Sequence, residues 1–304
     1  MKRTHTPNQT LLLAVVSVAS LASLTARAGE SPPTPSAHVR LDDAAKERFL
    51  LAGRIVRSRD AGGGITASRR ATLRLAGVEH DAHVQAIDQA KPVANLDEGP
   101  PELDFRDSYK NNVAAYRLDR LLALGMVPVS VVRRYEEDDA AFTWWVDDVR
   151  MSESERQKKK VEPPDVIRWN RQIGVVRTFD ELIYNTDRHL GNLLIDGDWR
   201  IWMIDHSRAF KIFKTIGRPE QLGTRSARQL LAALRGLDGA TLRERMEDVL
   251  TPGQVEALLA RRDQIVAHYD AIVAQIGEAA VLFDLPPRAG GPSPSRPPTS
   301  RERP

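Results

Sequence analysis

Apolar residues in the first part of the chain follow the two-residue period of β-strands in several short runs. Three of these runs are Ile55–Val56, Ala71–Leu75 and Ala82–Ile87, and two further strands are expected at Val127–Tyr135 and Thr143–Val149. Glycines at Gly62–Gly64 and Gly77 mark turns between the first three runs. One helix is expected at about 108–124, with Asp107 as its N-cap and Gly125 just beyond its end. This part is therefore predicted to be strand-rich with a single helix.

From about residue 165 the apolar positions follow the period of helices. A helix is expected over about 168–186. Thr251-Pro252-Gly253-Gln254 forms a capping box that opens a long helix to about Ile276, which Gly277 stops. Between these helices, two short apolar runs flank Asp196-Gly197-Asp198, which predicts a β-hairpin.

Composition narrows the class of protein. The chain has 304 residues, of which 41% are hydrophobic and 28% are charged. This is enough to bury a sizeable core and excludes a wholly disordered or fibrous protein. The chain has no cysteine, which excludes disulfides, thiolate catalysis and cysteine-ligated metal sites.

The first 28 residues have the layout of a secretory signal peptide. Lys2 and Arg3 precede the uncharged run Leu11–Leu24, and Ala26-Arg27-Ala28 fits a cleavage site. An uncleaved anchor is the alternative. Removing 1–28 takes away three basic residues and no acid, leaving 41 of each sign. A formally neutral chain gives no reason to expect a nucleic-acid partner, and no later run is apolar enough to span a membrane. We therefore expect an exported protein, periplasmic or secreted.

The predicted hairpin carries the strongest chemical signal. Asn192 precedes the first strand of this hairpin and Asp205 follows the second, so both stand at its open end. Amide and carboxylate oxygens side by side suit Mg²⁺ or Mn²⁺ bound together with substrate phosphates. Asp187 lies five residues before Asn192, at the end of the predicted helix, and can point toward the same open end of the hairpin. A structural hairpin with a helix-end ion pair is the plainer alternative for any one of these residues, but all three together favour catalysis.

The segment from Asp187-Arg188-His189 through Asn192 to Asp205 resembles the catalytic core of the atypical branch of the protein-kinase-like superfamily. Phosphatidylinositol 3-/4-kinases and secretory-pathway kinases share this layout. The resemblance implies that Asp187 is the catalytic aspartate and that Asn192 and Asp205 are metal ligands. It also implies structural and transition-state-stabilising roles for Arg188 and His189.

The fold that the resemblance implies is α+β, a two-lobed protein-kinase-like fold with a small β-rich N-lobe and a larger helical C-lobe. The expected divisions are a signal peptide (1–28), a linker (29–40), the N-lobe (41–150), a charged connector (151–164), the helical C-lobe with the catalytic hairpin (165–284) and a disordered tail (285–304). The implied cofactors are ATP with Mg²⁺ or Mn²⁺.

The chain departs from kinases at the phosphate-binding positions. The third strand has no lysine, and Gln85 is the best candidate for its place. Asn112 stands where its glutamate partner is expected, so a neutral pair replaces an ion pair without leaving a buried charge unpaired. Lys91, Lys110 and Arg74 are candidate substitutes for the missing cation.

Two further segments differ from the kinase pattern or extend it. Gly62, Gly63 and Gly64 lie where a phosphate-covering loop is expected and are assigned to nucleotide binding. Asp205-His206-Ser207 stands in place of Asp-Phe-Gly, which puts a movable activation segment in doubt.

These features predict an exported ATP-dependent phosphotransferase. Its acceptor hydroxyl stays open between a protein, a lipid head group and a sugar. Two alternatives remain: a catalytically impaired pseudokinase that binds a nucleotide or a protein, and nucleotidyl transfer by the same fold.

Overall fold

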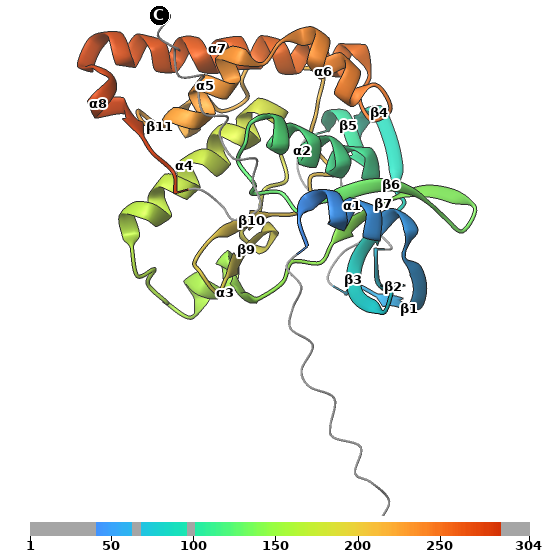
Figure 1. Ribbon diagram of the computed structural model, residues 1–304. Helices are drawn as coiled ribbons and strands as arrows, with labels where there is room; N and C mark the ends of the chain where they lie inside the picture. Colours follow the sequence, from blue (N-terminus) through green and yellow to red (C-terminus); the bar gives the residue numbers. More distant parts are fainter. Residues whose placement is uncertain (1–40, 63–67, 96–100, 287–304) are drawn as a thin grey trace, which may run out of the picture. The chain divides into compact units, whose positions relative to one another are not determined.

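The computed structural model describes residues 41–62, 68–95 and 101–286 (Figure 1). The predicted signal peptide, the whole predicted linker, Gly63, Gly64 and nearly all of the predicted tail lie outside these ranges. In the part of the chain that is described, no helix is long and apolar enough to cross a membrane.

A five-stranded antiparallel sheet forms the N-lobe, with strand order β1-β2-β3-β7-β6. Its strands are β1 (Arg54–Asp60), β2 (Arg69–Leu75), β3 (Val78–Gln85), β6 (Ser130–Tyr135) and β7 (Asp138–Trp144). Alternation gives the sheet two different faces. One face is apolar and includes Ala82, Val84 and Phe142, all buried. The register places Asp81, His83 and Gln85 on the opposite, polar face.

Two helices pack against the sheet. In α1 (Asp43–Ala52), Phe49 meets the ring of Trp144 edge-on at a centroid distance of 5.6 Å. The second helix, α2 (Tyr109–Leu121), packs against β6 and β7 and buries Val113 and Leu118 completely. Together these contacts form the apolar core of the N-lobe.

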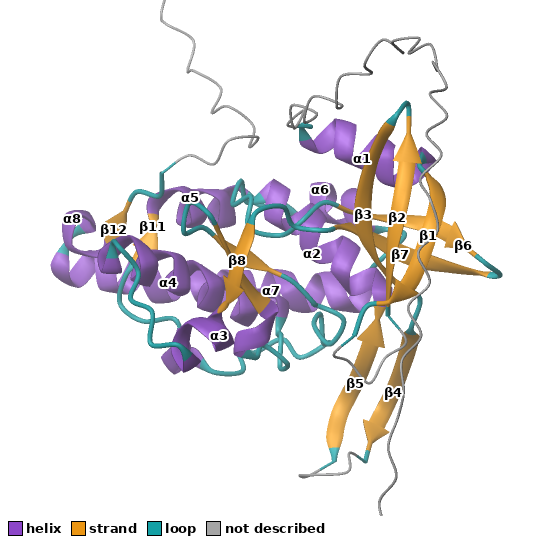
Figure 2. Cartoon of the chain, turned by 90° about the horizontal axis from the view of Figure 1, so that it is seen from below, coloured by secondary structure: helices purple, strands orange, loops and turns teal. Residues whose placement is uncertain are grey.

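A separate two-stranded sheet lies between β3 and α2 in the sequence. It consists of β4 (Asp88–Ala94) and β5 (Glu102–Ser108) and stands apart from the five-stranded sheet (Figure 2). Ion pairs join Glu102 to Arg208 and to the buried Lys211, and the amide of Ile212 donates to Asp104 at 2.8 Å. The hairpin is therefore bonded to the segment that follows Asp205.

The C-lobe is mainly helical. Its longest helices are α4 (Val166–Ile183) and α7 (Pro252–Ile276), which pack on each other, and its shorter ones are α3 (Glu153–Lys158), α5 (Arg228–Gly236), α6 (Gly239–Met246) and α8 (Glu278–Val281). A three-stranded sheet has the order β10-β9-β8, from β8 (Val149–Ser152), β9 (Leu193–Asp196) and β10 (Ile201–Met203). A short parallel pair joins β11 (Ser226–Ala227) to β12 (Leu282–Phe283).

Several sequence predictions are confirmed at the level of local structure. The capping box of Thr251 and Gln254 opens α7, which ends at Gly277, and the hairpin around residues 196–198 is formed by β9 and β10. The mixed α+β, two-lobed arrangement also agrees with the expectation.

Other boundaries were wrong. The N-cap of α2 is Ser108, whose hydroxyl accepts from the amide of Lys110, and not Asp107. The helix ends at Leu121 because Ala123 turns into the left-handed region with φ 52°. The strand expected at Thr143–Val149 runs instead over Asp138–Trp144, because Glu136 and Glu137 form a two-residue turn and the strand starts within the acidic run.

Burial in α2 can be tested by a matched pair of substitutions. Leu118→Ala removes a fully buried side chain, whereas Leu51→Ala changes one that is 50% exposed. We expect a loss of roughly 2–5 kcal/mol in unfolding free energy for Leu118→Ala and under about 0.5 kcal/mol for Leu51→Ala. Urea unfolding followed by circular dichroism measures both, and equal losses would contradict this packing.

Candidate active site

The open end of the β9–β10 hairpin brings two predicted site residues to one place. Leu193 pairs with Met203, and the amide of Ile204 donates to the carbonyl of Asn192 at 3.0 Å. Asn192 and Asp205 thus lie at the same end of the hairpin. Asn192 is buried, whereas Asp205 is exposed and has a left-handed backbone with φ 54°. The polypeptide therefore turns sharply at Asp205 and leaves its carboxylate accessible.

Arg188 links α4 to both arms of the hairpin at this open end. Its Nε and Nη2 donate to the buried carboxylate of Asp180 on α4, and its Nη1 donates to the carbonyls of Asn192 at 3.2 Å and Ile204 at 2.7 Å. Charge-assisted bonds of this kind are stronger than neutral ones. Arg188 is thus bonded to the protein on both sides, in keeping with a structural role.

Asp187 and His189 flank Arg188 and are both exposed. The amide of Asp187 donates to Oδ1 of Asn185 at 3.1 Å, which fixes the backbone at this residue. Nδ1 of His189 accepts from the amide of Gly191 at 3.1 Å, so only its Nε2 can reach a ligand. These contacts order the loop without using the Asp187 carboxylate.

Asp107 is a further acid of this region that the sequence analysis missed. Burial raises the pKa of Asp107, and the nearby carboxylates of Asp205 and Asp187 raise it further, while a hydrogen bond from Ser207 and the charge of Arg208 lower it. Its Oδ1 is buried and has no partner among the described residues. The sequence predicted a helix from about residue 108, which indicated an N-cap role for Asp107 and gave no sign of its place beside Asp187 and Asp205.

Gln85 and Asn112 are in direct contact, as the sequence predicted for the pair. Nδ2 of Asn112 donates to Oε1 of Gln85 at 2.6 Å. Oδ1 of Asn112 accepts from the backbone amide of His206 at 2.7 Å. Both side chains are buried. Asn112 therefore links the end of β3 to the residue after Asp205.

The neighbouring residues of α2 strengthen this link. Nδ2 of Asn111 donates to the carbonyls of Ser207 at 2.7 Å and Ala209 at 3.0 Å, and the amide of Ser108 donates to the carbonyl of Ser207 at 3.0 Å. His206 is buried against Phe179, and burial together with the charge of Arg188 holds the pKa of His206 well below its usual value. The sequence showed no periodic signal for Asn111, whose partners are backbone atoms distant in the chain.

The cations proposed as substitutes for a strand lysine have other partners. Lys110 pairs with Asp88 at 2.8 Å, Arg74 with Glu79, and Lys91 lies 5.9 Å from the ring centroid of Phe105. Of the glycine-rich segment only Gly62 is described. It has φ 72°, and its amide donates to the side chain of Asp60 at 2.8 Å.

The donor set fits a hard divalent cation. Among the described residues no group of three or more histidine or acidic side chains is arranged to hold a metal. Mg²⁺ commonly takes only one or two protein oxygens and completes its shell with phosphates and water, so Asn192 and Asp205 suffice. The terminal Nδ2 of Asn192 is buried and has no hydrogen-bond partner among the described residues, so this nitrogen does not tie the side chain to another part of the described structure.

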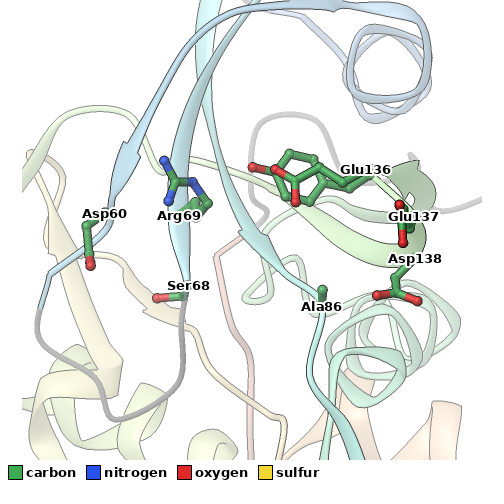
Figure 3. A pocket seen from close by; sticks show the side chains of 8 residues that line it. Asp60, Ser68, Arg69, Ala86, Glu136, Glu137 and Asp138 are labelled. Carbon is green, nitrogen blue, oxygen red and sulfur yellow. The ribbon is translucent and has the colours of Figure 1, made fainter.

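An acidic recess of about 540 Å³ lies elsewhere in the N-lobe (Figure 3). Asp60 and Arg69 line it from β1 and β2, and Glu136, Glu137 and Asp138 line it from the β6–β7 turn. None of the residues assigned to catalysis or metal binding contributes to it. The recess therefore does not include the open end of the β9–β10 hairpin.

Comparisons with solved structures identify the fold. Neither a protein-family model nor a curated protein matches this chain. The structure of hydra Fam20 with sugar aligns with a TM-score of 0.59 at 14% identity, over 79% of this chain and 92% of that one. The Golgi casein kinase with Mn and ADP bound aligns with a TM-score of 0.55 at 14% identity, over 79% and 78%. Another structure of the Golgi casein kinase gives 0.57 at 14% identity, over 80% and 78%.

These likenesses confirm the atypical kinase-like fold, with a small antiparallel sheet lobe and a helical lobe. Two of these three structures are of a kinase of the Golgi. The resemblance to phosphatidylinositol 3-/4-kinases stays a prediction.

The raised pKa of Asp107 gives a pH-dependent prediction. A carboxyl group with a raised pKa in the folded state opposes folding once it is ionised, and this penalty disappears below its ordinary pKa near about 4. We expect Asp107→Asn to be more stable than wild type at pH 7 without metal, with the difference shrinking as the pH falls toward about 3.5.

Urea unfolding in EDTA across this range measures the difference. Asp198→Asn, at an exposed carboxylate on the far end of the same hairpin, is the control. A loss of stability in Asp107→Asn at neutral pH would contradict the prediction.

Proposed function

We propose that this protein is a metal-dependent phosphotransferase that moves the terminal phosphoryl group of a nucleoside triphosphate, such as ATP, to an acceptor hydroxyl. The observation that carries the proposal is the meeting of Asn192 and Asp205 at the open end of one hairpin, with Asp187 at the start of the same loop. The kinase-like fold supports it, because this is where that fold performs phosphoryl transfer.

Oxygen atoms of Asn192 and Asp205 would hold Mg²⁺ or Mn²⁺. When bound, the cation supplies positive charge that offsets the charge of the phosphates. The protein contributes position: Arg188 fixes the carbonyls of Asn192 and Ile204, and Asn112 fixes the amide of His206 next to Asp205. Both ligands are thereby set in place before substrate arrives.

Asp187 would orient the acceptor hydroxyl and accept its proton. Its exposed carboxylate is anchored through its own backbone amide and is close enough to Asp107 to affect the pKa of that residue. Holding a nucleophile and a phosphoryl group in line accounts for much of the rate enhancement in this chemistry. His189, also exposed in this loop, can reach the transferred group through its Nε2.

The nucleotide would lie against the polar face of the N-lobe sheet, with Gln85 and Asn112 at its phosphate end, and the glycine-rich segment that begins at Gly62 is assigned to the same ligand. The acceptor is a protein, lipid or sugar hydroxyl. Export through the N-terminal leader belongs to the same proposal, and the chain's fold neighbours include a Golgi kinase.

A pseudokinase is the second candidate, favoured by one specific observation. Gln85 and Asn112 form a neutral buried pair where active kinases have a lysine and a glutamate. A protein of this kind would bind a nucleotide or a partner without transfer. Nucleotidyl transfer is a third outcome, which mass spectrometry of the modified acceptor would reveal as a nucleotide adduct.

Isothermal titration of residues 29–304 with ATP tests the proposal. We expect binding that requires Mg²⁺ or Mn²⁺ and is lost in Asp205→Ala. Asp198→Ala, which removes an exposed acid at the opposite end of the hairpin, should bind as wild type does. Absence of binding at millimolar ATP would sink the phosphotransferase proposal.

Transfer itself is tested at Asp187. Asp187→Asn should bind ATP normally and lower the rate of ATP consumption roughly 10²–10⁴-fold, the usual contribution of general acid–base catalysis. Metal-dependent binding without ATP consumption in wild type would instead support the pseudokinase.

A further inference from the structure

We infer that Gln85 presents its side-chain NH₂ group to the nucleotide phosphates, and that Asn112 sets this polarity without touching the nucleotide. The inference rests on the proposed function, because it describes how the same site holds a triphosphate. It concerns the one position at which this chain departs most from the kinase pattern.

The orientation of Asn112 is determined by its backbone partner. The amide of His206 is a fixed donor and lies 2.7 Å from one terminal atom of Asn112. That atom must be the oxygen, because an amide nitrogen cannot accept this bond. The other terminal atom, Nδ2, is consequently the one that faces Gln85.

The orientation of Gln85 follows from that of Asn112. Nδ2 of Asn112 lies 2.6 Å from a terminal atom of Gln85, and a donor facing this atom requires it to be Oε1. The Nε2 donor of Gln85 is therefore turned to the other side, and no described residue accepts a hydrogen bond from it. A single backbone amide thus determines the polarity of two side chains in series.

The surroundings of Gln85 suit a phosphate group. Gln85 shares the polar face of β3 with His83. Burial lowers the pKa of His83, and the charge of Asp205 partly opposes this shift. Asn112 also bonds to the residue adjacent to Asp205. The free donor is therefore held beside the proposed metal ligand, where the phosphates of a bound nucleotide would be.

Cations on β2, on α2 and in the segment after Asp205 are already paired with acids. Arg70 pairs with Asp81 at 2.6 Å, Lys110 with Asp88 at 2.8 Å, and Arg208 with Glu102. A neutral donor requires no buried counter-ion, unlike a lysine, which would need an acid in place of Asn112. Affinity for the nucleotide should consequently depend more on the divalent cation than in a kinase with the lysine.

Asn112→Asp tests the polarity directly. The carboxylate still accepts from His206, but its second oxygen can only accept from Gln85. The amide of Gln85 must then rotate to donate Nε2, and its oxygen turns toward the phosphates. We expect Mg²⁺–ATP affinity to fall roughly ten-fold or more, the loss of a hydrogen bond to a charged group.

A double-mutant cycle separates this rotation from the added charge. Gln85→Met removes the donor without introducing a charge and should lower affinity by about ten-fold. In the Gln85→Met background, Asn112→Asp should cost much less than it does in wild type, because no amide is left to rotate. Additive losses would overturn the inference, since they show that the two residues act independently.

Thermal melting shows whether each single variant folds. If one of them does not, a variant with a restored ion pair provides the test. Gln85→Lys/Asn112→Asp places a paired cation at the donor's position and should bind Mg²⁺–ATP at least as tightly as wild type. Loss of binding in this folded variant, or unchanged binding in Gln85→Met, would overturn the inference and leave the phosphotransferase proposal standing. No binding by wild type would overturn both.

Discussion

The site depends on one buried guanidinium. Arg188 is bonded at one side to Asp180 of α4 and at the other to two carbonyls, one on each arm of the β9–β10 hairpin. The side chains of Arg188 and Asp180 are only 8% and 5% exposed, so removing either leaves a charge buried without compensation. A helix, a loop and a hairpin are thereby held in one arrangement, and the positions of Asp187, Asn192 and Asp205 follow from it.

The second constraint joins the two lobes through α2. In its first turn, Asn111 donates two hydrogen bonds to backbone carbonyls of residues 207–209, and Asn112 accepts one from the backbone amide of His206. Farther along, Arg117 pairs with Asp248 and donates to the carbonyl of Arg245. Kinases have a charged lysine and glutamate at the third strand and this helix, whereas the side chains here are neutral amides. The backbone partners of Asn111 and Asn112 cannot change between donor and acceptor. The arrangement is consequently insensitive to pH at these contacts.

How far the sequence predicted the structure depends on distance along the chain. Asp187, Asn192 and Asp205 lie on one loop and one short hairpin, so spacing was enough to place them together. The contact between Gln85 and Asn112 spans 27 residues and came only through the kinase resemblance. Asp107 and Asn111 were missed because their partners lie about 100 residues away and are largely backbone or polar atoms without periodicity. The β4–β5 hairpin was missed because its first strand is almost wholly exposed and lacks an alternating apolar pattern.

The bonds between β5 and the segment after Asp205 bear on the timing of local motion. Residues 208–212 are joined to Glu102 and Asp104 on one side, and Arg261, fully buried on α7, donates to the carbonyls of Lys211 and Phe213 on the other. Opening this segment requires breaking contacts with both lobes at once. Its amide protons should therefore exchange with solvent at the rate of cooperative unfolding, and not at the rate of loop fraying. Residues 208–212, which follow Asp205 in the chain, then belong to the most protected part of the described structure.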